Sequence, residues 1–268
     1  MSFCYTVQPY ENMRQEPSFH SRVVSQVLFA EPLCVEGEWG GWMYIRSPDG
    51  YRGWISKIAC LKRAEPYKPT GYTSRLATHL YLHKDIDFGP AMTLPYGIAV
   101  EVQEISDPRW MQLTLPDGKK VFIQRGDIQQ EGTLLHKKEL TSFSKRFLGL
   151  PYTWGGRCSF GYDCSGFVQM LYQKLGIFLP RDAKDQMLDE RLRSVALEDM
   201  EPGDLLFFGK EAKNIGHVGL FLGEGSFIHT SSRENKPWLR ESLLSDPEWS
   251  AGPEVYYPYR VAMQFVPR

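Results

Sequence analysis

The feature that most constrains the fold is a pattern that occurs twice in the first half of the chain. A Trp-Met pair stands at Trp42 and again at Trp110, and a Pro-Asp-Gly tripeptide follows at 48–50 and again at 116–118. Both features recur at an offset of 68 positions. A fixed offset over several anchors indicates two copies of one structural module.

Each copy has the pattern of a small all-β barrel. The first copy contains short strand-like runs separated by turn residues, at 22–29, 33–35, 42–46 and 51–55. The Pro-Asp-Gly tripeptide between the last two runs favours a tight hairpin, because glycine adopts positive φ without steric cost. Each copy resembles a bacterial SH3-like (SH3b) domain. We place these domains at 1–64 and 65–133, joined by a Pro-rich segment.

The remaining residues, 134–268, are expected to form one α+β domain. Apolar residues at helical spacing predict a helix within 135–148, which ends before Gly149 and Pro151. Three apolar runs then predict antiparallel strands of a meander, at 204–208, 217–222 and 226–230. We expect a long, partly irregular excursion at 232–253 and a final strand at 255–259.

Cys164 is expected to lie in the first turn of a helix. Glycine and aromatic residues precede it from Tyr152 on, and apolar residues at helical spacing follow from Phe167. Unpaired N–H groups and the helix dipole favour an anion there, so the thiol should ionise more easily than a free cysteine. A thiolate is the form that attacks carbonyl carbons. The alternative is that Cys164 only packs a tight turn.

Two histidines follow on neighbouring predicted strands. His217 opens one strand and His229 lies near the end of the next, so a short turn can place both imidazoles on one face. If the Cys164 helix packs on that face, the three side chains stand in the order nucleophile, base and orienting group. Taken singly, each histidine is more simply explained as a half-buried strand residue.

Composition excludes several classes of function. The formal net charge is −1 and there is no long basic run, so neither nucleic acid nor an anionic membrane is an expected partner. The five cysteines are an odd number without a Cys-x-x-Cys pair, which argues against a disulfide framework or a zinc site. The first residues show neither a basic nor an apolar signal region, so we expect a cytoplasmic protein.

An ordered set of motifs covers about the last half of the chain. In order, they are Tyr152-x-Trp154-Gly155-Gly156, Gly161-x-Asp163-Cys164-Ser165-Gly166, Pro180-Arg181, Pro202-Gly203-Asp204, Gly216-His217-Val218-Gly219 and Phe227-Ile228-His229. With these motifs the chain resembles the NlpC/P60 cysteine peptidases, papain-like α+β enzymes that cut bacterial cell-wall peptides. The resemblance implies Cys164 as nucleophile, His217 as general base, His229 as orienting residue and the Tyr152 hydroxyl near the oxyanion.

Two SH3b-like modules before such a domain resemble the γ-D-glutamyl-L-diamino-acid endopeptidases of muropeptide recycling. The resemblance implies cleavage between γ-D-glutamate and a diamino acid, diaminopimelate or lysine, in free stem peptides with an N-terminal L-Ala. Substrate contacts are implied for a set of residues from both halves of the chain: Asp163, Ser165, Asp182, Trp154, Glu16 and Tyr51. Family members often carry serine where this chain has Ala183, which removes one possible polar contact.

Several alternatives stay open for these residues and for the whole chain. Asp163 could cap the Cys164 helix, Trp154 could belong to the cleft wall or to the core, and Glu16 and Tyr51 could be ordinary surface residues. The chain could instead be a non-catalytic SH3b protein that binds the cell wall, or an amidase of other specificity. The peptidase reading requires no metal or cofactor, and its expected partner is a peptidoglycan-derived peptide bound by a monomer.

Overall fold

A computed structural model describes residues 3–130, 134–249 and 257–266 of the chain. The chain divides into two compact units. Unit 1 comprises Met1–Thr133 together with Arg157–Phe160, and unit 2 comprises Leu134–Gly156 and Gly161–Arg268. None of the helices within the described ranges is long and apolar enough to cross a membrane.

Unit 1 begins with a seven-stranded sheet in the order β3-β2-β6-β5-β4-β1-β7. Its strands are β1 (Phe3–Thr6), β2 (Tyr10–Arg14), β3 (Val23–Leu28), β4 (Pro32–Trp39), β5 (Trp42–Arg46), β6 (Arg52–Ser56) and β7 (Cys60–Arg63). The 3₁₀ turn η1 (Lys57–Ala59) connects the last two strands. The sheet closes around a small apolar core that contains Met13, Val27 and Ile45.

The rest of unit 1 forms a five-stranded sheet, β13-β12-β11-β8-β14, and a hairpin of β9 and β10. These strands are β8 (Gly71–Thr73), β9 (Ala77–Leu80), β10 (Met92–Pro95), β11 (Ala99–Gln103), β12 (Trp110–Thr114), β13 (Lys120–Gln124) and β14 (Ile128–Gln129). The turn η2 (Arg125–Asp127) follows β13. The short strand β15 (Arg157–Cys158) also belongs to this unit.

The repeated sequence pattern folds into two hairpins with the same register. Met43 pairs with Ile55 across β5 and β6, and Met111 pairs with Ile123 across β12 and β13. The turn glycine of each tripeptide has a φ of +83°, and the 3₁₀ turns η1 and η2 follow at equivalent positions. The hairpin turns predicted from Pro-Asp-Gly are therefore confirmed, and strands β1 and β2 add to those predicted.

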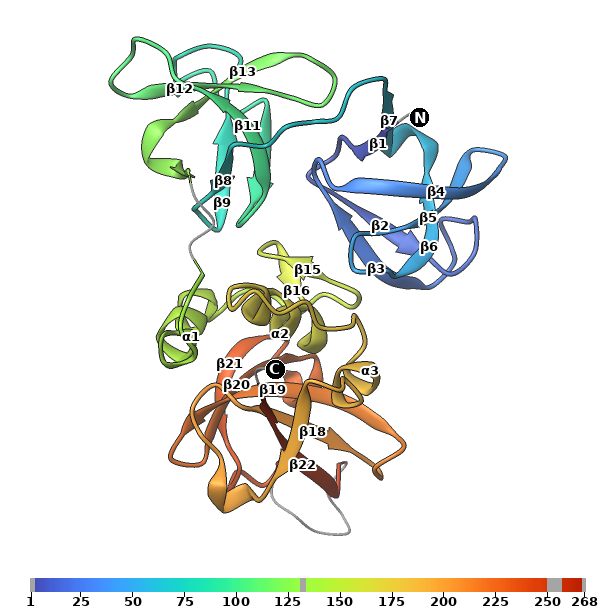
Figure 1. Cartoon of the computed structure of the whole chain (residues 1–268), viewed down its shortest axis with the longest axis vertical. Coiled ribbons are helices and arrows are strands. Elements are labelled where there is room, and N and C mark those ends of the chain that lie inside the picture. Colours follow the sequence, from blue (N-terminus) through green and yellow to red (C-terminus); the bar gives the residue numbers. More distant parts are fainter. Residues whose placement is uncertain (1–2, 131–133, 250–256, 267–268) are drawn as a thin grey trace. The chain divides into compact units, whose positions relative to one another are not determined.

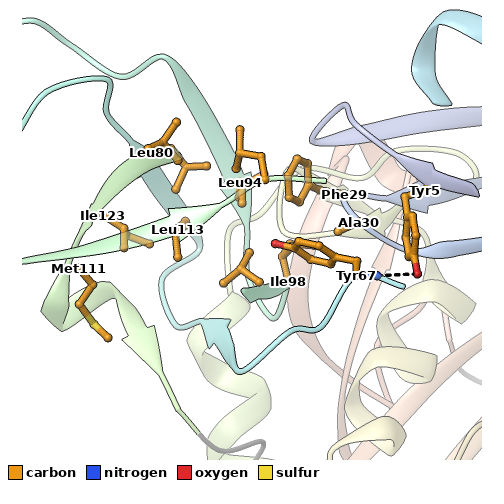
Figure 2. Packing of buried hydrophobic residues seen from close by; sticks show 13 residues of the cluster. Tyr5, Phe29, Ala30, Tyr67, Leu80, Leu94, Ile98, Met111, Leu113 and Ile123 are labelled. Carbon is orange, nitrogen blue, oxygen red and sulfur yellow. Dashed lines mark hydrogen bonds between the residues drawn. The ribbon is translucent and has the colours of Figure 1, made fainter. Parts of the chain in front are cut away.

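One apolar cluster runs through both parts of unit 1 (Figure 2). Tyr5 and Phe29 contribute from the first part, and Leu80, Leu94 and other residues contribute from the second. Tyr67 lies in the connection, where its backbone N–H donates to the Tyr5 hydroxyl at 2.9 Å. Because the same apolar core includes residues from both parts of unit 1, the two parts are packed against each other.

Unit 2 is built on a six-stranded antiparallel sheet in the order β17-β22-β18-β19-β20-β21 (Figure 1). Its strands are β17 (Leu192–Val195), β18 (Leu205–Gly209), β19 (Ile215–Gly223), β20 (Ser226–Ser231), β21 (Trp238–Leu243) and β22 (Tyr259–Phe265). Every residue of β18 is buried, because this central strand is covered on both faces. The β18–β19–β20 meander predicted from the sequence is confirmed.

Three helices contact the central strand β19: α1 (Lys137–Ser144), α2 (Cys164–Gln173) and α3 (Ala183–Met187). The turns η3 (Lys145–Phe147), η4 (Leu197–Asp199) and η5 (Arg233–Asn235) and the strand β16 (Gly161–Tyr162) complete the unit. Phe147, Tyr162 and Phe167 meet edge to face beneath α2. The apolar face of α2 therefore anchors its first turn, which carries Cys164.

One expectation for the end of the chain is wrong. The described part of the 232–253 segment is partly irregular, as expected, and it contains β21, which pairs along β20 from Ser226–Leu243 to Ser231–Trp238. The last strand begins at Tyr259 and runs to Phe265, whereas the predicted strand was 255–259, of which 255–256 lie outside the described residues. Residues 250–253 of the excursion lie outside them as well.

Candidate active site

The first turn of α2 is built so that Cys164 is its first residue. Asp163 is the N-cap, and its Oδ1 accepts a hydrogen bond from the Gly166 N–H at 2.7 Å. A Cβ on Gly166 would lie 2.1 Å from the carbonyl oxygen of Gly156, so only glycine lets the loop approach this turn. The predicted helix start at Cys164 is therefore confirmed.

The sulfur of Cys164 lies against the beginning of β19. It accepts a hydrogen bond from the backbone N–H of Val218 and another from that of Ser165. Val218 directly follows His217 along β19, so the thiol lies beside the segment of the strand that carries the first imidazole. Cys164 as a whole residue is half-buried.

The two histidines are buried and hydrogen-bonded to each other. The distance from His217 Nε2 to His229 Nδ1 is 3.0 Å, and the rings meet nearly at right angles. His217 is 4% exposed and His229 is fully buried. This bond engages Nε2 of His217 and Nδ1 of His229. The predicted placement of both imidazoles on one face of the sheet is confirmed.

A third side chain extends this row of hydrogen bonds. His229 Nε2 lies 3.0 Å from the hydroxyl oxygen of Ser242 on β21. The row therefore runs from His217 through His229 to Ser242 and crosses the three neighbouring strands β19, β20 and β21.

Burial dominates the protonation of the thiol and the imidazoles. Burial, and after it the charge of Asp163, raise the pKa of Cys164 to about 12, although the Val218 N–H and Arg181 act to lower it. Burial also lowers the pKa of His217 to about 3, aided by the charges of Arg233 and Arg240. The expectation of an easily ionised thiol is wrong, because desolvation outweighs the effect of the helix N-terminus.

A buried ion pair supports the N-cap. Arg181, 3% exposed, donates to both carboxylate oxygens of Asp163, at 3.0 and 2.6 Å, and to the Ser165 hydroxyl at 2.9 Å. The Gly155 N–H also donates to Asp163. Asp163 is therefore a helix cap, as one alternative proposed, and its charge is compensated within unit 2.

Tyr152 lies on the loop that precedes α2. Its backbone N–H donates to the Pro237 carbonyl at 2.8 Å, which fixes the loop beside the start of β21. Burial raises the pKa of Tyr152, followed by the charges of Cys164 and Asp163. Its hydroxyl is therefore protonated at neutral pH and can act as a hydrogen-bond donor near the thiol.

Aromatic rings enclose His217 on the side of β22. The ring of Trp249 stacks on His217 at 5.1 Å between centroids, and the ring of Tyr257 is parallel to it at 6.2 Å. The Arg233 guanidinium carbon lies 4.0 Å from the centre of the Tyr257 ring. A Cβ on Gly216 would meet the Tyr257 hydroxyl at 2.9 Å, which explains the glycine before His217.

The remaining predicted site residues differ in exposure. Trp154 is 55% exposed, so it does not belong to the core. Asp182 is half-buried as the N-cap residue of α3, and its charge acts on Arg181. In unit 1, the side chain of Glu16 is exposed, and the Glu16 backbone N–H donates to the Ser21 hydroxyl. Tyr51 is half-buried and packs against the apolar core that contains Met13, Val27 and Ile45.

Sequence reasoning missed several residues of this site. Ser242 and Tyr257 carry no local signal, because their proximity to the histidines depends on strand pairing and on packing across the sheet. Arg181 had a usable signal, since Pro180-Arg181 is one of the ordered motifs, but no role was assigned to it. No group of three or more His, Cys, Asp or Glu residues that could hold a metal ion occurs in the described part of the chain.

Comparisons with known proteins agree with this arrangement. The model of the NlpC/P60 family matches residues 149–250, and the model of the bacterial dipeptidyl-peptidase Sh3 domain matches residues 13–59. A match to a second SH3 domain is not among these findings, so the two-barrel prediction is supported for the first barrel alone.

Relatives extend over most of the chain. A γ-D-glutamyl-L-lysine dipeptidyl-peptidase of Bacillus subtilis (strain 168) is 34% identical over 227 residues, which cover 78% of this chain and 72% of that protein. Dipeptidyl-peptidase 6 of Lysinibacillus sphaericus is 25% identical and covers 84% of this chain and 86% of that protein.

The fold has a counterpart among solved structures. The crystal structure of an NlpC/P60 family protein from Bacillus cereus ATCC 10987 superposes with a TM-score of 0.83 at 20% identity, with full coverage of both chains. The matched family model, the extent of the B. subtilis similarity and the Cys164–His217–His229 geometry lead to one conclusion. The chain belongs to the NlpC/P60 family and carries a bacterial SH3 domain ahead of its peptidase domain.

Proposed function

We propose that this chain is a cysteine peptidase that hydrolyses the bond between γ-D-glutamate and a diamino acid in peptidoglycan stem peptides. The observation that carries the proposal is the position of the Cys164 sulfur, which takes the Val218 N–H beside His217, while His217 is held by His229 at 3.0 Å. This is the order of nucleophile, base and orienting residue that acyl transfer requires.

The first step begins from a neutral thiol and a neutral imidazole. Nδ1 of His217 takes the proton from Cys164 as the sulfur attacks the γ-carbonyl carbon of D-Glu. The backbone N–H of Cys164 at the start of α2 and the Tyr152 hydroxyl donate hydrogen bonds to the developing oxyanion. A donor of this kind typically lowers the barrier by about 3 kcal/mol.

The second half of the reaction returns the site to its starting state. The His217 imidazolium gives its proton to the amine nitrogen of the diamino acid, the C–N bond breaks and a thioester remains on Cys164. His217 then takes a proton from water, the hydroxide attacks the thioester carbon, and the sulfur leaves and regains its proton. The products are a peptide with a new γ-carboxylate and a free diamino acid or the peptide that begins with it.

The proposed substrate is a free stem peptide that starts with L-Ala. The names of the B. subtilis and B. cereus relatives, γ-D-glutamyl-L-lysine dipeptidyl-peptidases, support this substrate class. On the resemblance described above, Glu16 and Tyr51 help to hold the substrate amine, and Asp182 and Trp154 contact the peptide. Asp163 and Ser165 are buried and bonded to Arg181, which supports a role in shaping the pocket.

The architecture and location of the protein complete the proposal. We infer that residues 65–133 form a second SH3-like barrel, because β12 and β13 repeat the register of β5 and β6. We place the protein in the cytoplasm as a monomer. All five cysteines lie in the described ranges and carry no disulfide, which is the usual state in a reducing compartment.

The experiment uses four defined tripeptides and the full chain. L-Ala-γ-D-Glu-L-Lys and its diaminopimelate counterpart are incubated with the protein, each alongside its N-acetylated twin, and the products are identified by mass spectrometry. We expect L-Ala-γ-D-Glu from at least one free tripeptide, none from the acetylated twins, and none with Cys164→Ala. No cleavage of any peptide would favour a binding protein instead. Turnover by Cys164→Ala would refute Cys164 as the nucleophile. Equal cleavage of the acetylated twins would refute the amine requirement, and Glu16→Gln should raise KM without changing kcat.

A further inference from the structure

The hydrogen bonds of the two histidines do not end at His229. Ser242 on β21 lies opposite Phe227 on β20, and residues paired across antiparallel strands project to the same face. Phe227 and His229 are two positions apart, so their side chains share that face as well. This register brings the Ser242 hydroxyl to 3.0 Å from His229 Nε2.

The direction of the protons along this row decides whether His217 can act as a base. A neutral imidazole has one N–H donor and one acceptor nitrogen. If His229 donates from Nε2 to Ser242, its Nδ1 accepts the Nε2–H of His217, and Nδ1 of His217 keeps the lone pair that the thiol proton needs. If the row runs the other way, His217 carries its proton on Nδ1 and cannot accept one from Cys164.

Ser242 is the residue that can favour the productive direction. His229 is fully buried, so an Nε2–H without an acceptor would be a costly buried donor. Ser242 is half-buried, and its own hydroxyl hydrogen can turn toward solvent while its oxygen accepts from His229. Burial lowers the pKa of both histidines, so both rings are neutral at pH 7. Each neutral ring carries its proton on either Nδ1 or Nε2, and the hydrogen bonds of the row decide which.

We propose that Ser242 is a positioning residue that fixes the tautomers of His229 and His217, so that Nδ1 of His217 faces Cys164 as a proton acceptor. This inference rests on the proposed peptidase activity for its kinetic consequence, but not for its spectroscopic one. It gives Ser242 on β21 a role that follows neither from the ordered motifs nor from the family match.

The primary test measures tautomers directly and needs no substrate. Long-range ¹H–¹⁵N correlation spectra of the imidazoles, recorded at pH 7 on the full chain, distinguish a protonated Nδ1 from a protonated Nε2. Signals of His217 and His229 are assigned by replacing the other histidines one at a time. We expect Nε2–H on both rings in the wild-type protein. A wild-type spectrum with Nδ1–H on His217 overturns the inference, even if the peptidase activity is present.

The second test compares three variants by spectra and kinetics. Ser242→Ala should shift His217 toward the Nδ1–H tautomer and lower kcat roughly 10- to 100-fold, the scale found when the hydrogen-bond partner of a metal-ligating histidine is removed. KM should stay unchanged, because Ser242 acts through His229 and His217. Ser242→Thr keeps the hydroxyl and should restore most of kcat and the wild-type tautomer.

A matched control separates this role from general damage to the sheet. Ser194 lies exposed on β17 of the same sheet, so Ser194→Ala should change neither spectra nor kcat. Unchanged tautomers in Ser242→Ala would overturn the inference, as would a Thr variant as slow as the Ala variant. If the stem peptides are not cleaved at all, the proposed function fails while the spectra still decide on Ser242.

Discussion

Replacing Arg181 by methionine removes a buried guanidinium group, and the unbranched methionine side chain fills the space of the aliphatic part of the arginine. The side chain of Arg181 is 1% exposed and that of Asp163 is 12% exposed, so the change leaves a carboxylate in a site with little water. Two hydrogen bonds to Asp163 and one to Ser165 are lost with it. The variant therefore tests whether this ion pair holds the first turn of α2 in place.

The expected cost follows from what remains around Asp163. Removing one partner of a buried ion pair typically costs about 3–5 kcal/mol. In Arg181→Met the carboxylate keeps the Gly155 and Gly166 N–H groups and the Ser165 hydroxyl, so we expect the lower end, about 3 kcal/mol. For a unit of this size that corresponds to a loss of about 10 °C in melting temperature.

The assay combines thermal melting with the reactivity of the thiol. The charge of Arg181 lowers the pKa of Cys164 and that of Asp163 raises it. Alkylation of Cys164 at pH 8, followed by mass spectrometry of the peptide, should therefore slow in Arg181→Met and accelerate in Asp163→Asn. The double variant should cost less stability than the sum of the single variants, because neither unpaired charge remains.

Two results would refute this reasoning. A melting temperature of Arg181→Met within about 2 °C of wild type would mean that the pair contributes little to unit 2. Equal alkylation rates in the two single variants would mean that neither charge reaches the sulfur. Hydrogen exchange on peptides from α2 locates any loss of stability and separates it from changes in unit 1.

Three further predictions test the surroundings of the site. Gly166→Ala should destabilise unit 2 by about 1–3 kcal/mol in thermal melting, because its Cβ would lie 2.1 Å from a neighbouring carbonyl oxygen. Arg233→Gln should raise the pKa of His217, since the arginine charge lowers it, and so move the acidic limb of the kcat/KM profile to higher pH. Asp204→Ala should cost about 1–3 kcal/mol by the same melting assay, because the buried carboxylate that accepts from Lys137 at 2.6 Å and from the Glu201 N–H at 2.8 Å is lost.

Local patterns predicted the elements that depend on few residues. The Pro-Asp-Gly turns, the start of α2 at Cys164 and the meander from β18 to β20 all follow from turn chemistry, capping and apolar runs of short range. The last strand was predicted at 255–259, whereas Tyr259–Phe265 forms it. Its position depends on pairing with β17 and β18, which lie far away in the sequence. Strand β21 was missed because its alternating exposure is typical of an edge strand with weak apolar signal.

Contacts between distant residues could not be read in the same way. The pairing of Arg181 with Asp163 spans 18 positions, and the bond from His229 to Ser242 requires the register of two strands. The burial of Cys164 depends on all the elements packed around it, which is why helix position alone gave the wrong direction for its pKa. A motif identifies which groups take part, whereas their protonation is set by the packing around them.

The protonation of Cys164 and His217 yields one more prediction, on the wild-type protein. With the pKa of Cys164 raised to about 12 and that of His217 lowered to about 3, thiol and imidazole are both neutral at pH 7. Alkylation of Cys164 by iodoacetamide should therefore be slow at pH 6 and still rise above pH 9, with the exposed Cys34 in the same sample as a reference. A rate that reaches its plateau below pH 7 would show a preformed thiolate–imidazolium pair. In that case the helix N-terminus and the Val218 N–H would outweigh burial, and His217 would not need to take the proton during the attack.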